Sequence, residues 1–205
     1  EDHVGKVTLR VHLAGTAWRN AWNVWVYPKY TSEDPSPVTV TEAWNESARQ
    51  TLERGGDVLL LPRTIAPMRR VKGAFEPIFW NTQWFPGQDR QLGVLCEPAH
   101  PALAAFPNDG HTDWQWWELL DTSVSVRLDG LNPHFRPIIQ IIDDWNKNRL
   151  LGAVFEGRTG KGRLLVCTLD ITHELENRPA AAALRRSLLA YMASERFAPR
   201  FDMPP

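Results

Sequence analysis

The sequence contains very little cysteine. Cys96 and Cys167 are the only two in 205 residues, so no disulfide framework is expected. Both lie in apolar surroundings, which favours two buried thiols that pack as small hydrophobic side chains. The sequence has no CxxC or HExxH pair, and we therefore predict no metal site.

An excess of charge of one sign is also missing. The chain has 23 Lys and Arg against 24 Asp and Glu, a formal net charge of −1. Such a chain lacks the basic surface of a duplex-binding protein, so we expect no nucleic-acid partner. It has no polybasic segment for anionic membranes, and no apolar run reaches the roughly 18 residues that a spanning helix needs. We therefore expect no membrane insertion.

No apolar leader precedes the first predicted element, because the chain begins with Glu1-Asp2-His3. We expect a signal peptide to be absent or already removed, and the chain to be either a mature protein or a piece of a longer one. A chain of this length can form one large domain, which would bury roughly 70% of its unfolded surface.

Residues 1–30 have a different side-chain pattern from the rest of the chain. Residues 7–12 and 22–27 alternate apolar and polar side chains, which predicts two antiparallel strands. Two strands alone are marginal in water, so we assign 1–30 to the terminal strands of a β-sandwich. The alternative is that they extend the sheet of the main domain. The polar, proline-bearing residues 30–37 then predict a linker.

Residues 31–205 read as an α/β domain. Residues 38–40 predict a strand, and a helix capped by Thr41 is expected from Glu42 to about Arg54. The segment 57–61, which is apolar throughout after Asp57, is typical of a buried parallel strand, and it completes a β-α-β unit. Further elements are expected as short helices at 100–106 and 112–120, strands at 124–128, 138–142, 150–155 and 164–169, and a helix from 179 to about 194.

Motifs for cofactor binding and covalent catalysis are lacking. The glycine-rich segment 157–162 is followed by a strand rather than a helix, which favours a hairpin turn over a phosphate loop. Neither cysteine has the small flanking residues of a nucleophile elbow. Acidic residues are plentiful, but no pair stands in a recognisable pocket. We therefore predict no cofactor and no catalytic residue.

The chain is rich in tryptophan, with ten residues. Two clusters, 79–85 and 113–117, mix aromatic rings with amides and an acid, and such a mixture complements both the apolar face and the hydroxyls of a sugar. The candidate carbohydrate-binding residues are Trp80, Asn81, Gln83, Trp84, Asp113, Trp114, Trp116 and Trp117. The alternative is that these rings pack a loop-rich core or an interface with a neighbouring domain.

A set of short motifs runs through most of residues 20–197. It comprises residues 23–28 (Asn-Val-Trp-Val-Tyr-Pro), 52–61 with Gly55-Gly56, Gly73-Ala74-Phe75, Phe79-Trp80-Asn81, Trp84-Phe85-Pro86, Leu92-Gly93, 100–103 (His-Pro-Ala-Leu), 113–117 (Asp-Trp-Gln-Trp-Trp) and Arg178-Pro179. Together the motifs resemble the C-terminal part of bacterial glycoside hydrolases related to family 2, the β-galactosidase-like enzymes.

The resemblance implies a fold and a role. The fold is the end of a β-sandwich followed by a mainly parallel, flavodoxin-like sheet with flanking helices, as in class I glutamine amidotransferases. The role is a non-catalytic accessory domain that supports, oligomerises or shapes the site of a periplasmic or secreted glycoside hydrolase. The implied partner is an upstream catalytic domain of the same polypeptide, with carbohydrate and a homo-oligomer as further candidates. A stand-alone carbohydrate-binding module and an independent hydrolase remain the alternatives.

Overall fold

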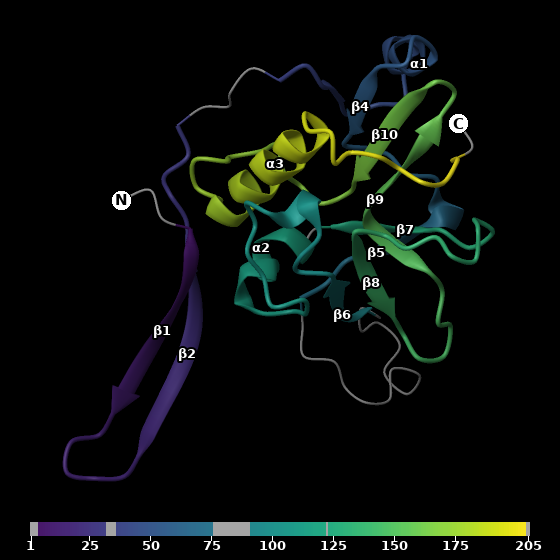
Figure 1. The fold of residues 1–205 in the computed structure, drawn as a ribbon. Coiled ribbons are helices and arrows are strands. Elements are labelled where there is room, and N and C mark those ends of the chain that lie inside the picture. Colours follow the sequence, from purple (N-terminus) through teal and green to yellow (C-terminus); the bar gives the residue numbers. More distant parts are fainter. Residues whose placement is uncertain (1–3, 32–35, 76–90, 122, 204–205) are drawn as a thin grey trace.

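A computed structural model describes residues 4–31, 36–75, 91–121 and 123–203. It shows a mixed α/β body from which a long two-stranded hairpin extends (Figure 1). In the part of the chain that is described, no helix is both long and apolar enough to cross a membrane.

The N-terminal hairpin consists of β1 (Gly5–His12) and β2 (Arg19–Val26), which pair antiparallel in a sheet of their own. This confirms the two strands expected from the alternating pattern. Leu9 lies opposite Trp22 and Val7 opposite Val24. Because side chains alternate along a strand, these apolar residues share one face of the hairpin, while Lys6, Thr8 and Arg10 lie on the other. No described strand of the body pairs with the hairpin.

The body contains one eight-stranded sheet. Its strands are β3 (Thr39–Thr41), β4 (Asp57–Leu60), β5 (Arg70–Lys72), β6 (Gln91–Cys96), β7 (Val124–Arg127), β8 (Ile139–Asp143), β9 (Leu151–Thr159) and β10 (Gly162–Cys167). The order is β3-β4-β10-β9-β7-β5, and β8 pairs with β9 and with β6. The four strands expected at 124–169 are therefore present.

The expectation of a mainly parallel sheet is not confirmed. Among the described strands only β3–β4 and β4–β10 are parallel pairs, and all other pairings are antiparallel. Parallel neighbours need a crossover of a dozen or more residues, whereas antiparallel strands can be joined by two. β9 and β10 are joined by Gly160 and Lys161 alone, with Gly160 at a φ of +62°. The expected hairpin turn at 157–162 is thus present.

Helix α1 (Glu46–Glu53) connects β3 to β4. The predicted start at Glu42 with a Thr41 cap is wrong, because Thr41 is the last residue of β3 and residues 42–45 carry the chain away from the sheet. Asn45 is the N-cap, and its side chain accepts a 2.9 Å hydrogen bond from the Ala48 amide. Gly55, at a φ of +87°, follows the helix as expected.

The remaining helical elements are shorter than expected except the last. The segment 100–106 contains only the 3₁₀ turn η2 (Pro101–Leu103), and the segment 112–120 consists of η3 (Trp114–Trp116) followed by α2 (Trp117–Leu120). A third 3₁₀ turn, η1 (Pro67–Arg69), precedes β5. The final helix α3 (Pro179–Met192) lies where it was predicted.

Helices cover both faces of the sheet, as expected (Figure 1). Leu59 of β4 packs in the larger core cluster, together with residues of α3, η2 and α2. Val58 and Leu60 point to the opposite face, where α1 and Met203, near the end of the chain, pack against them. This alternation explains the unbroken apolar run 58–61 within the segment 57–61, because both faces of β4 are buried.

Candidate functional site

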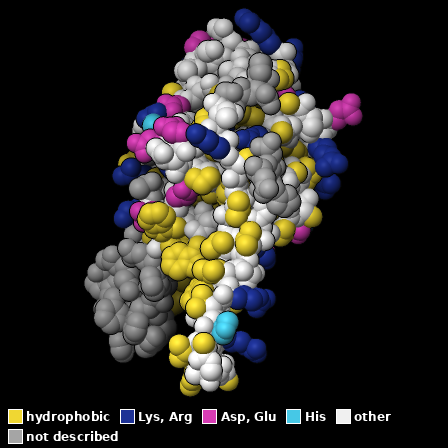
Figure 2. All heavy atoms as spheres, turned by 90° about the vertical axis from the view of Figure 1, so that its left-hand side faces the viewer, with side chains coloured by type: hydrophobic (Ala, Val, Ile, Leu, Met, Phe, Trp, Pro, Cys, Tyr) yellow, Lys and Arg dark blue, Asp and Glu magenta, His cyan; other side chains and the backbone are white. Residues whose placement is uncertain are grey.

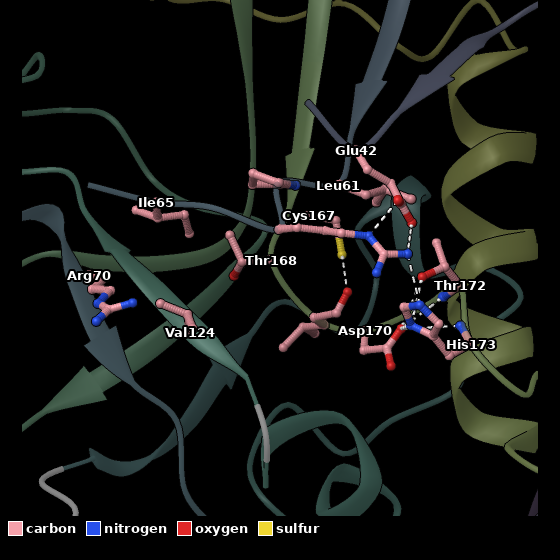
Figure 3. Close-up of a pocket in the computed structure, with 13 residues that line it drawn as sticks. Glu42, Leu61, Ile65, Arg70, Val124, Cys167, Thr168, Asp170, Thr172 and His173 are labelled. Atoms are coloured by element: carbon pink, nitrogen blue, oxygen red, sulfur yellow. Dashed lines mark hydrogen bonds and ion pairs between the residues drawn. The ribbon is translucent and has the colours of Figure 1, made fainter. Parts of the chain in front are cut away.

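A pocket lies where the three parallel strands end. Glu42 follows β3, Arg63 comes after β4 and Asp170 comes after β10, so all three residues line the pocket at one edge of the sheet. Figure 3 shows Glu42 and Asp170 on the same side of this pocket. Ligands of open α/β sheets bind at this carboxyl edge. The carboxyl-edge pocket has a volume of about 300 Å³. Its lining residues are Glu42, Leu61, Pro62, Arg63, Ile65, Arg70, Val124, Cys167, Thr168, Leu169, Asp170, Thr172 and His173.

An ion pair forms one side of the pocket. The guanidinium of Arg63 donates hydrogen bonds to both carboxylate oxygens of Glu42. Nε donates to Oε2, and Nη2 donates to Oε1 at 2.7 Å. This planar two-point contact is the geometry that arginine offers a carboxylate. The hydrogen bonds from Arg63 lower the pKa of Glu42, so its carboxylate is ionised at neutral pH.

The second carboxylate of the pocket is held by several donors. Asp170 Oδ1 accepts hydrogen bonds from the Thr172 amide at 3.1 Å and from His173 Nδ1 at 2.9 Å, and Oδ2 pairs with Arg178 Nη1 at 2.9 Å. Burial alone would raise the pKa of Asp170, but these donors and the charge of Arg178 outweigh it and lower the pKa to about 2. Asp170 is therefore a permanent anion at neutral pH.

His173 connects the two ion pairs. Its Nε2 lies 2.8 Å from Nη2 of Arg63. A guanidinium can only donate, so Nε2 accepts, and the ring proton belongs on Nδ1, from which it is donated to Asp170. The partners thus assign His173 to one neutral tautomer, with both ring nitrogens occupied.

The pocket has no activated nucleophile among its lining residues. The thiol of Cys167 is buried and contacts the Leu169 carbonyl oxygen at 3.7 Å. Burial raises its pKa to about 12, so the reactive thiolate is scarce at neutral pH. Within the described residues, no three His, Cys, Asp or Glu side chains are grouped so as to hold a metal ion.

Arg70, the first residue of β5, lines the pocket from another direction. Figure 3 shows it across the pocket from Glu42 and His173. Its side chain is exposed, and among the described residues it has no side-chain partner. It is therefore the uncompensated charge of the pocket.

The structure separates the candidate carbohydrate-binding residues. Trp116 is fully buried and packs edge-on against Phe106, with ring centroids 5.2 Å apart. Trp114 and Trp117 are 71% and 54% exposed, and Trp114 contacts Phe75 at a centroid distance of 5.8 Å. Trp80, Asn81, Gln83 and Trp84 lie outside the described residues.

Asp113, the remaining candidate, has a structural role. Its side chain caps η3 by accepting a 3.1 Å hydrogen bond from the Gln115 amide, and it also accepts one from Trp25 Nε1. Burial raises the pKa of Asp113, although both hydrogen bonds oppose the rise. Both of its oxygens are thus engaged within the protein.

The sequence reasoning did not single out Glu42, Arg63 and His173 as site residues. A signal for the first two was present, because Glu42 and Arg63 each lie two residues after the end of a predicted strand, 38–40 and 57–61. Polar residues at the carboxyl ends of parallel strands mark a binding edge. His173 lies further from its strand, and its position depends on the turn made by residues 170–173.

Comparison with known proteins gives a family. Residues 39–205 match the family described as Domain of unknown function (DUF8487), and no curated protein matches the chain. The matched region begins at β3 and includes the whole body with the carboxyl-edge pocket, whereas the N-terminal hairpin precedes it. Because the match covers well over half of the chain, the protein belongs to the DUF8487 family.

Proposed function

We propose that this chain is a non-catalytic accessory domain of a glycoside hydrolase, and that it packs on a neighbouring β-domain of the same polypeptide. The observation that carries the proposal is the apolar face of the N-terminal hairpin. Its five central members, Val7, Leu9, Val11, Trp22 and Val24, are between 43% and 55% exposed. Figure 2 shows hydrophobic side chains along the hairpin and its junction with the body.

An uncovered face of this kind indicates a missing partner. Contiguous apolar surface on a soluble protein marks an interaction site, and a two-stranded sheet is marginally stable by itself. One apolar and one polar face are what a strand pair of a β-sandwich presents. A sandwich layer packed on Leu9 and Trp22 would remove that surface from water.

The body holds the hairpin in a defined position. Trp25 donates to Asp113, and Lys6 Nζ forms an ion pair with Asp109 at 2.8 Å. Tyr27, just after β2, stacks on Phe106. Because these contacts lie at the base of the hairpin, they support a rigid orientation of the apolar face for docking.

The carboxyl-edge pocket supports a non-catalytic role. Glu42 and Asp170 are both ionised and engaged by cations, so neither is poised as a general acid near neutral pH. The buried thiol of Cys167 is not activated. The location of the pocket supports a relationship to glutamine amidotransferase-like sheets, and we propose that β3, β4 and β10 are the parallel part of such a sheet.

The experiment measures association between this chain and the upstream part of its polypeptide, which in this proposal comprises the catalytic domain and the neighbouring β-domain. We expect Leu9→Lys to weaken association at least tenfold, because it places a charge in the docked face. Thr8→Lys is the matched control on the polar face and should bind as the parent does. Equal behaviour of the two variants, or hydrolysis of aryl glycosides by this chain alone, would refute the proposal.

A carbohydrate-binding module is the second candidate function, and the exposure of Trp114 and Trp117 favours it. Exposed rings can stack on the apolar face of a sugar. Titration of the tryptophan fluorescence with oligosaccharides would detect such stacking, and Trp114→Ala should abolish the signal without changing the melting temperature.

A further inference from the structure

The carboxyl-edge pocket contains two carboxylates, but both are already satisfied. Glu42 accepts two hydrogen bonds from the guanidinium of Arg63. Asp170 accepts hydrogen bonds from His173 and Thr172 and forms an ion pair with Arg178. Because the charge of each carboxylate is already compensated by an arginine, the pocket offers a cationic ligand little net attraction.

Hydrogen-bond donors, by contrast, remain available. Arg63 uses Nε and Nη2 for Glu42 and His173, which leaves Nη1. Arg70 offers all five of its N–H groups, since no described side chain is paired with it. Two guanidinium groups with unused donors on different sides of a small pocket favour a ligand rich in acceptors and negatively charged.

Part of the remaining lining is apolar. Ile65 and Val124 lie on the same side of the pocket as Arg70 (Figure 3). An apolar floor beside polar groups complements a sugar ring, whose C–H groups pack on alkyl side chains while its oxygens face the donors. The volume of about 300 Å³ is at the small end for ligand sites and is adequate for a single monosaccharide.

We propose that the carboxyl-edge pocket binds a carboxylate-bearing monosaccharide, a uronic acid, with its carboxylate on Arg70 and its ring oxygens toward Arg63. Arginine binds a carboxylate through two parallel N–H···O bonds, which fixes the orientation of the sugar as well as supplying affinity. The choice of a sugar acid over another anion rests on the proposed carbohydrate-related function, whereas the preference for an anion follows from the pocket itself.

The test is calorimetric titration of the whole chain with glucuronate, its uncharged methyl ester, glucose, acetate and inorganic phosphate. We expect glucuronate to bind at least about tenfold more tightly than the methyl ester or glucose, the loss typical of a charge-assisted contact. Acetate and phosphate should bind more weakly still, because they have no ring to pack on Ile65 and Val124. Equal binding of glucuronate, acetate and phosphate would overturn the sugar assignment, and no binding of glucuronate would overturn the whole proposal.

Two neighbouring arginines provide a matched pair of variants. Arg70→Gln should weaken glucuronate binding at least about tenfold, whereas Arg69→Gln removes an equal charge from an exposed residue outside the pocket lining and should leave binding unchanged. Both side chains are exposed, so the melting temperatures should stay near that of the parent. Equal losses in the two variants would indicate nonspecific charge attraction and refute the site.

The association experiment on the N-terminal hairpin is independent of this pocket. Failure of glucuronate binding with intact association through Leu9 would overturn only the ligand assignment. If glucuronate binds specifically but Leu9→Lys and Thr8→Lys associate equally well, the ligand site is supported and the accessory role is refuted.

Discussion

Trp25 Nε1 donates a 2.6 Å hydrogen bond to Asp113 Oδ2, joining two residues that are 88 positions apart. The same carboxylate caps η3 through the Gln115 amide. One side chain thus links the N-terminal hairpin to the tryptophan-rich segment of the body, and the position of each depends on the other.

This junction predicts different outcomes for two truncations. Tyr27 stacks on Phe106 and donates a hydrogen bond to Gln115, so residues 27–205 should fold cooperatively without the hairpin. Residues 31–205 should also fold, but with a free energy of unfolding about 2 kcal/mol lower than 27–205, because an aromatic pair and a partly buried hydrogen bond are lost.

Urea unfolding followed by circular dichroism measures both truncations. Each should be more soluble than the parent chain, since the apolar face of the hairpin has been removed. Loss of cooperative unfolding in 27–205 would show that the hairpin is an integral part of the body.

Substitution of three neighbouring tryptophans should separate core from surface. Trp116→Ala should lower the free energy of unfolding by about 3–5 kcal/mol, because the fully buried ring leaves a cavity. Trp114→Ala and Trp117→Ala should change it by less than about 1 kcal/mol, as expected for exposed side chains. Thermal and urea unfolding check the series, and a large loss on Trp114→Ala would contradict the structure.

Asp170 should make stability depend on acid pH. Its pKa in the folded state is lowered to about 2, so the ionised form stabilises the fold above the unfolded pKa of about 3.9 and this contribution is lost as the pH falls toward 2. Because one-third of the side chain is exposed to solvent, we expect only about 1 kcal/mol after screening.

The variant Asp170→Asn isolates that contribution. At pH 7 it should be less stable than the parent by about 1 kcal/mol, and the difference should shrink between pH 4 and pH 2. A constant difference across this range, measured by urea unfolding, would show that the charge of Asp170 is not responsible.

The two thiols should be inert in the folded protein. Burial raises the pKa of Cys96 and of Cys167 to about 12, so labelling by iodoacetamide at pH 8 should be on the order of 10³-fold slower than for an ordinary thiol. Unfolding in urea should restore the normal rate. Rapid labelling of either residue in the native protein would indicate an activated thiol and reopen the question of catalysis.

Local patterns in the sequence determined the elements. The alternation in 7–12 and 22–27 predicted β1 and β2, and the run 57–61 predicted β4. The long apolar helix α3 was placed within two residues. These predictions succeed because side-chain periodicity is a property of a short segment and records which faces are buried.

Only the tertiary structure decided how the strands pair. An apolar strand has the same side-chain pattern whether its neighbour is parallel or antiparallel, so the directions of β7 and β8 relative to β9 could not be assigned from their own residues. The exposure of the apolar face of the hairpin could not be predicted from the sequence either, since alternation shows that one face is apolar but not whether another element covers it.

The carboxyl-edge pocket depended on the same long-range information. Glu42, Arg63 and Asp170 were recognisable as polar residues after apolar runs, but they become one site only because β3, β4 and β10 are adjacent and parallel. The sequence by itself determined which side chains each strand presents and where each strand ends. Strand order decided which of those ends meet. The β4–β10 pairing joins residues more than 100 positions apart, such as Asp57 and Arg163, and no local pattern records it.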